Sequence, residues 1–175
     1  MTSIANNNTT YSPETITEVK KGLVSWVAQL ELTLNQNLRF DNLVDPKSTQ
    51  KSQKKVIFDR YTKFMKQFED IDFDLAFFVH CSILFRRVME RRKPESNLKD
   101  LLYVFASCLF ISLKYVADDT ICFISEFAEF TGLEKKKIEI LEQGILIDVL
   151  DFNVHVPAAL YEQELNYLQT LTATF

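Results

Sequence analysis

The residues that most often perform chemistry are few in this sequence and lie far apart. Its two histidines are His80, inside an apolar run, and His155, near a later proline. Neither has a serine, cysteine or carboxylate at the spacing of a catalytic triad or a metal site. Asp118 and Asp119 lack the partner acid of a carboxylate mechanism, and 3 glycines are too few for a phosphate-binding loop. We therefore expect a protein that is not an enzyme, with no metal, cofactor or small-molecule substrate.

The composition of the 175 residues is that of a folded, helical domain. Apolar residues make up 47% and charged residues 25%, with only 3 Gly and 4 Pro. These shares exclude a disordered or collagen-like chain, and so few turn-forming residues argue against a many-stranded β fold. The 20 Lys and Arg against 24 Asp and Glu give a net charge of −4. Such a charge gives no general attraction to a phosphate backbone, so we expect no nucleic-acid partner.

The cysteines and the apolar runs bear on the compartment. Cys81, Cys108 and Cys122 each lie in an apolar run without CxxC spacing. An odd number of such residues is typical of reduced core thiols in an intracellular protein, cytoplasmic or nuclear. The first ten residues lack the basic start and apolar stretch of a signal peptide, and no apolar run reaches the roughly 18 residues that span a bilayer. We expect no membrane association.

The elements that must position the remaining polar residues are helices, because apolar residues recur at steps of three and four. The pattern predicts a disordered tail over 1–11, a helix over 12–40, a linker over 41–53 and a last helix over 157–175. Between them it predicts five helices, over about 57–68, 74–93, 97–116, 121–131 and 134–151. The second and third of these are apolar nearly all round, which predicts a central pair wrapped by the other helices.

One part of the sequence resembles the cyclin box. It begins with SCLFISLKYVADD over 107–119 and continues with EFA at 126–128, TGL at 131–133, LE at 141–142 and LDFNV at 150–154. Cyclin boxes pass in this order from a buried A-C-L-x-L-A-S-K-type helix, through an acidic turn, to a helix ending in L-x-F. The resemblance covers 54–156 and implies an all-α bundle, a five-helix box with one flanking helix on each side. It is strongest to single-box cyclins of the phosphate-pathway, U/P and Y types.

The resemblance implies that two polar residues bind the partner protein. They are a lysine at the end of the third box helix and a glutamate in the fifth box helix. Lys114 matches the lysine, although a lysine snorkelling from a buried helix end would look the same. Counting forward from Gly132 places the glutamate at Glu142, whereas counting back from Phe152 places Gln143 there. A one-residue insertion such as a π-bulge would reconcile the two counts. An exposed helix carboxylate is the simpler interpretation of Glu142.

Two further groups of residues are candidates for partner contacts. The resemblance implies that exposed apolar residues contact a protein kinase. The candidates, each of which also fits the core, are Phe110, Leu113, Leu146 and Phe152. A basic cluster that could bind a phosphorylated or acidic segment comprises Arg86, Arg87, Arg91, Arg92 and Lys93. We favour the simpler interpretation that these cations complement the dipole at the end of their helix.

The resemblance implies a regulatory subunit that forms a heterodimer with a cyclin-dependent protein kinase. Such a subunit grips the kinase's mobile regulatory (PSTAIRE-type) helix and activates the kinase, in the cell cycle or in phosphate signalling. A cyclin-fold adaptor that binds a protein other than a kinase is the alternative, and the uncertain position of the glutamate motivates it.

Overall fold

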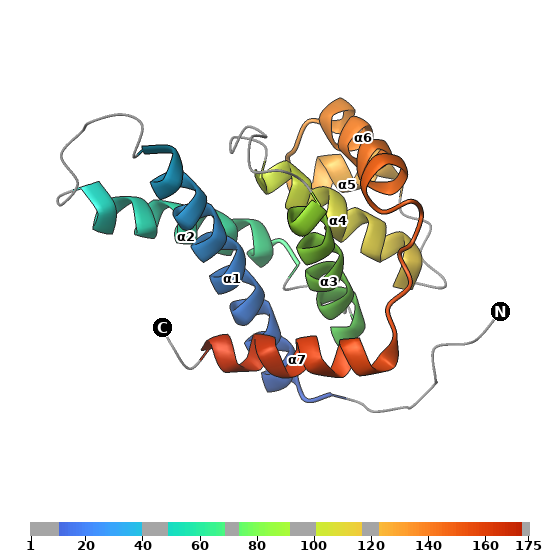
Figure 1. Ribbon diagram of the computed structural model, residues 1–175, viewed down its shortest axis with the longest axis horizontal. Helices are drawn as coiled ribbons and strands as arrows, with labels where there is room; N and C mark the ends of the chain where they lie inside the picture. Colours follow the sequence, from blue (N-terminus) through green and yellow to red (C-terminus); the bar gives the residue numbers. More distant parts are fainter. Residues whose placement is uncertain (1–10, 40–48, 69–73, 92–100, 117–122, 173–175) are drawn as a thin grey trace.

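The chain is all-helical in the residues that the computed structural model describes, 11–39, 49–68, 74–91, 101–116 and 123–172, and no strand occurs among them (Figure 1). The predicted all-α class is therefore confirmed. The elements are α1 (Pro13–Arg39), α2 (Thr49–Lys66), α3 (Leu75–Arg91), α4 (Leu101–Val116), α5 (Ile124–Thr131), α6 (Lys135–Gly144), the π-helix η2 (Ile145–Val149) and α7 (Ala158–Thr172).

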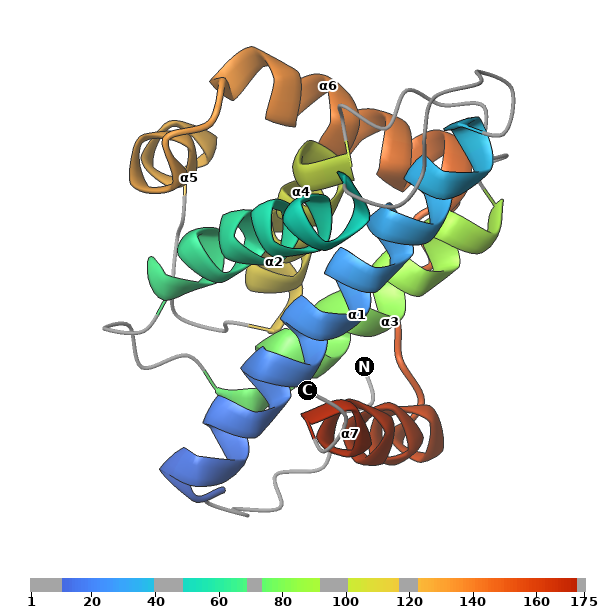
Figure 2. The ribbon, with the colours of Figure 1, turned by 90° about the vertical axis from the view of Figure 1, so that its left-hand side faces the viewer.

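The centre of the molecule is the pair α3 and α4, as the sequence predicts. Most side chains of both helices are buried. α1 and α7 pack on α3, while α6 packs on α4 (Figures 1 and 2). Burial on all sides explains why neither helix has a polar face.

Aromatic rings fill the space where these helices meet. The fully buried Phe105 of α4 has Phe85 of α3 at 5.5 Å and Tyr61 of α2 at 6.0 Å between ring centroids. Trp26 of α1 lies 5.4 Å from Phe85 in the same edge-to-face manner. Such pairs place the positive ring edge against the negative face of the neighbour, so they fix the relative orientation of the helices as well as burying area.

The flanking helices α1 and α7 approach each other closely (Figure 2). A Cβ atom on Gly22 of α1 would lie 2.0 Å from the backbone oxygen of Leu168 in α7. Only glycine fits at this crossing. Buried Glu31 fastens α1 to α2 as well, since it accepts a hydrogen bond from Tyr61 at 2.6 Å and pairs with Arg60.

Two helix ends agree with the sequence pattern, whereas the start of α2 does not. Ser12 accepts a hydrogen bond from the backbone N–H of Thr15 at 3.2 Å, as an N-cap does. Gly132, with φ of 66°, ends α5 in the left-handed conformation. The predicted linker is wrong over 49–53, because α2 already begins at Thr49. The sequence of this stretch has no apolar stripe, but Gln and Lys are good helix formers. Residues 40–48 and 1–10 lie outside the described residues. The predicted disordered tail is wrong at its last residue, because Tyr11 is partly buried against the core.

Candidate functional site

Lys114 and Glu142 meet between the last turn of α4 and the end of α6. The Lys114 Nζ donates to Glu142 Oε1 at 2.7 Å and lies 4.3 Å from the centroid of the Phe110 ring. The Lys114 side chain is 47% exposed and that of Glu142 10%. One carboxylate oxygen accounts for one of the ammonium's three donors. The pair therefore lies at the rim of the molecule, where an approaching backbone carbonyl can reach the ammonium.

The structure brings Glu142, and not Gln143, to Lys114. Glu142 is buried, whereas Gln143 points to solvent. α6 continues into the π-helix η2, in which the N–H of Leu150 donates to the oxygen of Ile145 at 2.8 Å. A π turn holds one residue more than an α turn. The predicted π-bulge is thus confirmed. It adds one residue to the helix between Gly132 and Phe152.

An unusual backbone conformation follows η2. Asp151 and Phe152 have φ of 48° and 55°, in the left-handed region. Each such residue costs about 1–2 kcal/mol when it is not glycine, somewhat less for Asp. The N–H of Phe152 donates to the oxygen of Leu146 at 2.8 Å, which turns the chain back over η2. This turn leaves the Phe152 side chain 65% exposed.

The four apolar candidates for partner contacts differ in their exposure. Phe110 and Leu113 are buried, 0% and 3% exposed, so their assignment to the kinase-facing surface is wrong. The reason is that α3 and α6 cover α4, while the Phe127 ring of α5 lies 4.9 Å from that of Phe110. Leu146 is half-buried, and Phe152 alone of the four is well exposed.

Two further isoleucines are exposed and were not predicted from the sequence as candidates for partner contacts. Ile140 of α6 is 60% exposed and Ile147 of η2 is 56% exposed. Ile140 and Ile147 are seven residues apart and lie on the side of the helix opposite the buried Ile138 and Ile145. This spacing is the signal that could have identified them.

The three described arginines of the possible basic patch, Arg86, Arg87 and Arg91, have acceptors within the chain itself. The guanidinium of Arg86 donates to both carboxylate oxygens of Glu164 in α7, at 2.9 and 3.1 Å. It also lies 4.5 Å from the centroid of the Trp26 ring. Arg87 and Arg91 donate to backbone carbonyls. These acceptors come from parts of the chain that are distant in sequence, so no local pattern around the arginines could have indicated them. Arg92 and Lys93 lie outside the described residues.

His80 is a satisfied core histidine, as expected. Its Nε2 bonds the carbonyl of Val154 and its Nδ1 bonds the hydroxyl of Ser112, both at 2.9 Å. A carbonyl only accepts, so Nε2 carries the proton and Nδ1 accepts from the serine. Burial is the main reason why the pKa of His80 is lowered to about 4; the hydrogen bond to the Val154 carbonyl opposes this shift, and the charges of Arg87 and His155 add to it. The ring is neutral at pH 7.

Other chemistry finds no support in the described residues. Among them no group of three His, Cys, Asp or Glu side chains gathers as metal ligands, and no helix could cross a membrane. Cys81 and Cys108 are buried, and burial raises the pKa of the Cys81 thiol well above its ordinary value. Asp118, Asp119 and Cys122 lie outside the described residues. The chain matches no family model, no curated protein and no solved structure.

Proposed function

We propose that this chain is a single-box cyclin that binds a cyclin-dependent protein kinase and activates it. In this proposal α2 to η2 form the box and α1 and α7 are its flanking helices. The contact between Lys114 and Glu142 carries the proposal. These are the two positions that the cyclin resemblance identifies, they are 28 residues apart in sequence, and they belong to the helices that the resemblance requires.

The geometry supports binding of a helix end. The last carbonyls of a helix have no partner inside that helix and carry partial negative charge. The exposed Lys114 ammonium can donate to such carbonyls, and the free lone pairs of Glu142 can accept from N–H groups of the adjoining loop. Exposed Phe152 and Ile147 supply the bulky apolar contacts on which much of an interface's affinity depends.

The activation follows from what the gripped helix does in the kinase. Its displacement places a glutamate of the kinase against the catalytic lysine of the kinase. The cyclin contributes no reacting group, so we propose no enzymatic activity for this chain. A kinase partner of this kind locates the protein inside the cell, in the cytoplasm or the nucleus.

The adaptor alternative has less support. Its motivation is the uncertain register of Glu142 and Gln143, and η2 accounts for that register without any departure from the cyclin arrangement. An adaptor nevertheless remains a defined outcome of the experiment that tests the proposal.

The proposal is tested by capture of partners from a lysate of the source organism with the purified chain, followed by mass spectrometry and a protein-kinase assay. The variant is Lys114→Glu. Its matched control is Lys21→Glu, which reverses an exposed lysine on the α7-proximal half of α1, far from α6 (Figure 1). We expect wild type and Lys21→Glu to retain a kinase that Lys114→Glu loses. Folded wild type that retains no kinase refutes the proposal, and a retained non-kinase protein that Lys114→Glu loses supports the adaptor.

A further inference from the structure

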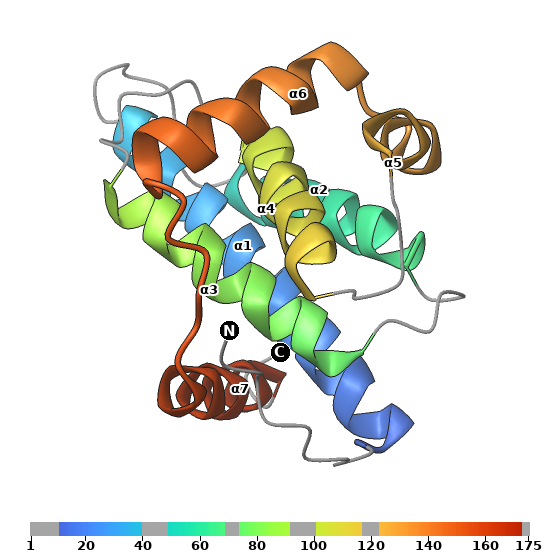
Figure 3. The same ribbon diagram turned by 90° about the vertical axis from the view of Figure 1, so that its right-hand side faces the viewer.

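Side chains of α3 bind the backbone of the exit segment, which we define as residues 150–157 between η2 and α7. Figure 3 shows this segment running alongside α3. One guanidinium nitrogen of Arg87 donates to the oxygens of Asn153 and His155, at 3.1 and 3.0 Å. His80 donates to the oxygen of Val154, the carbonyl between them, at 2.9 Å.

A third side chain of α3 holds the other end of the left-handed turn. Arg91 donates to the oxygen of Val149, the last residue of η2. Residues 80, 87 and 91 recur at helical spacing, so they lie on one face of α3. The carbonyls before and after Asp151 and Phe152 are therefore both fixed from the same helix.

These bonds explain why the left-handed pair persists. Two successive non-glycine residues in this region are unfavourable and last only where the surroundings over-determine them. Hydrogen bonds from a charged guanidinium are roughly twice as strong as neutral ones. Arg87 and Arg91 supply such bonds on the two sides of the pair.

We infer that Arg87 and Arg91 are positioning residues that hold the exit segment in the left-handed turn and so present the exposed Phe152 ring as a preformed anchor for the partner. They do not contact the partner themselves. The part that concerns the partner rests on the proposed function, whereas the part that concerns the backbone does not. A preformed anchor spares the complex the cost of ordering the segment during binding.

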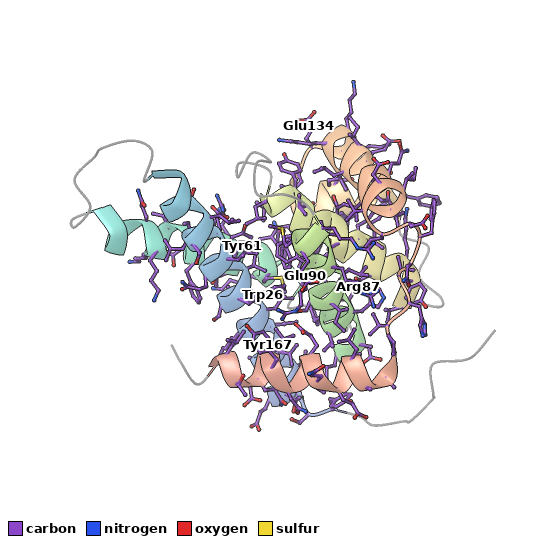
Figure 4. The ribbon with its side chains drawn as sticks, in the orientation of Figure 1. Trp26, Tyr61, Arg87, Glu90, Glu134 and Tyr167 are labelled. Carbon is purple, nitrogen blue, oxygen red and sulfur yellow. The ribbon has the colours of Figure 1, made fainter. Side chains whose placement is uncertain are left out.

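The backbone part is tested by hydrogen exchange of the full chain. The variant is Arg87→Gln, and the matched control is Glu90→Gln, which also neutralises a charge near the end of α3 (Figure 4). We expect exchange of amides 150–155 to become at least tenfold faster in Arg87→Gln, with α1 and α4 unchanged. Glu90→Gln should exchange like wild type, and Arg87→Lys, which keeps one charged donor group, should lie between. Unchanged exchange at 150–155 in Arg87→Gln overturns the inference.

The partner part is tested by a double-mutant cycle against the kinase captured by wild type. We expect Arg87→Gln and Phe152→Ala each to weaken binding at least tenfold. Since Arg87 acts through Phe152, the double variant should bind no more weakly than Phe152→Ala alone. Additive effects would show that Arg87 acts on the partner independently and overturn this part.

Failure of the inference and failure of the proposed function give different results. If wild type captures no kinase, the proposed function fails, while hydrogen exchange still decides whether Arg87 holds the turn. If the kinase binds and Arg87→Gln loosens the segment without weakening the complex, the proposed function stands and the presentation of Phe152 is refuted. If Arg87→Gln does not fold, Arg87→Lys takes its place in both tests.

Discussion

His80 joins α3, α4 and the exit segment through one neutral imidazole. Its hydrogen bonds to Ser112 and Val154 use both ring nitrogens, and Tyr115 stacks on the ring at 4.9 Å. Both nitrogens of the His80 ring are thus engaged within the protein, and neither is left to bind a ligand. Such a histidine serves the shape of the site and not its chemistry.

The neutral state of His80 predicts a pH dependence of stability. Its folded pKa of about 4 lies below the ordinary value of 6.5, so the unfolded chain binds more protons between these values. The free energy of unfolding should therefore fall by up to about 3 kcal/mol as the pH drops from 6.5 to 4. Urea unfolding at a series of pH values measures this, and His80→Gln should lack that part of the slope. An equal slope in both proteins contradicts the assignment.

The left-handed turn predicts that a glycine stabilises the protein. Asp151 is exposed and has φ of 48°, a conformation that glycine adopts without the steric cost that a Cβ atom brings, so we consider the change Asp151→Gly. We expect the free energy of unfolding to rise by about 0.5–1 kcal/mol, because relief of strain exceeds the entropy that glycine adds to the unfolded chain. Denaturant unfolding checks this value. Destabilisation would mean that the turn is not strained.

At the scale of the elements, each flanking helix is attached through a buried carboxylate. Glu31 binds α1 to Tyr61 and Arg60 of α2, and Glu164 binds α7 to Arg86 and to Ser82, whose hydroxyl donates at 2.5 Å. A buried charge needs such partners, because an unpaired one is expensive to remove from water. The flanking helices are thus docked with defined orientation, and α7 cannot rotate without breaking these bonds.

The crossing of α1 and α7 predicts a large effect of one methyl group. In Gly22→Ala the new Cβ would overlap the backbone oxygen of Leu168, 2.0 Å away, which cannot turn aside as a side chain could. We expect a loss of about 2–3 kcal/mol, larger than the roughly 1 kcal/mol that alanine gains by helix propensity.

Gly144→Ala is the control for this prediction. Its new Cβ would meet only Asp148 Oδ2, at an ordinary 3.8 Å, so propensity alone should raise stability by up to about 1 kcal/mol. Thermal unfolding of both variants decides the matter. Equal effects in the same direction would mean that α1 and α7 do not cross at Gly22.

At the scale of the whole molecule, local signals in the sequence predict the helices and long-range packing decides the rest. The stripes of α3 and α4 and the caps at Ser12 and Gly132 depend on neighbours a few residues away, so they could be predicted. The burial of Phe110 and the partner of Arg86 depend on segments far along the chain, and Glu164 is 78 residues from Arg86. No local pattern contains that information.

The candidate site divides in the same way. The resemblance selects Lys114 and leaves Glu142 and Gln143 as alternatives, and only the structure shows that Glu142 is the one that contacts Lys114. The mismatch of one residue between the two counts is itself a signal of the π turn. The clamp of Arg87 on the exit segment could not be predicted, since its acceptors are backbone carbonyls, which no sequence distinguishes.

The most direct test of the central claim is the dissociation constant for the captured kinase, measured with wild type, Lys114→Glu, Glu142→Lys and the double variant that exchanges the two charges. The exchange restores an ion pair within the chain but reverses the donor and the acceptor that face the partner. We predict that the double variant recovers the melting temperature of wild type and still binds the kinase at least tenfold more weakly. Recovery of both would contradict the account, because Lys114 and Glu142 would then only hold α4 to α6.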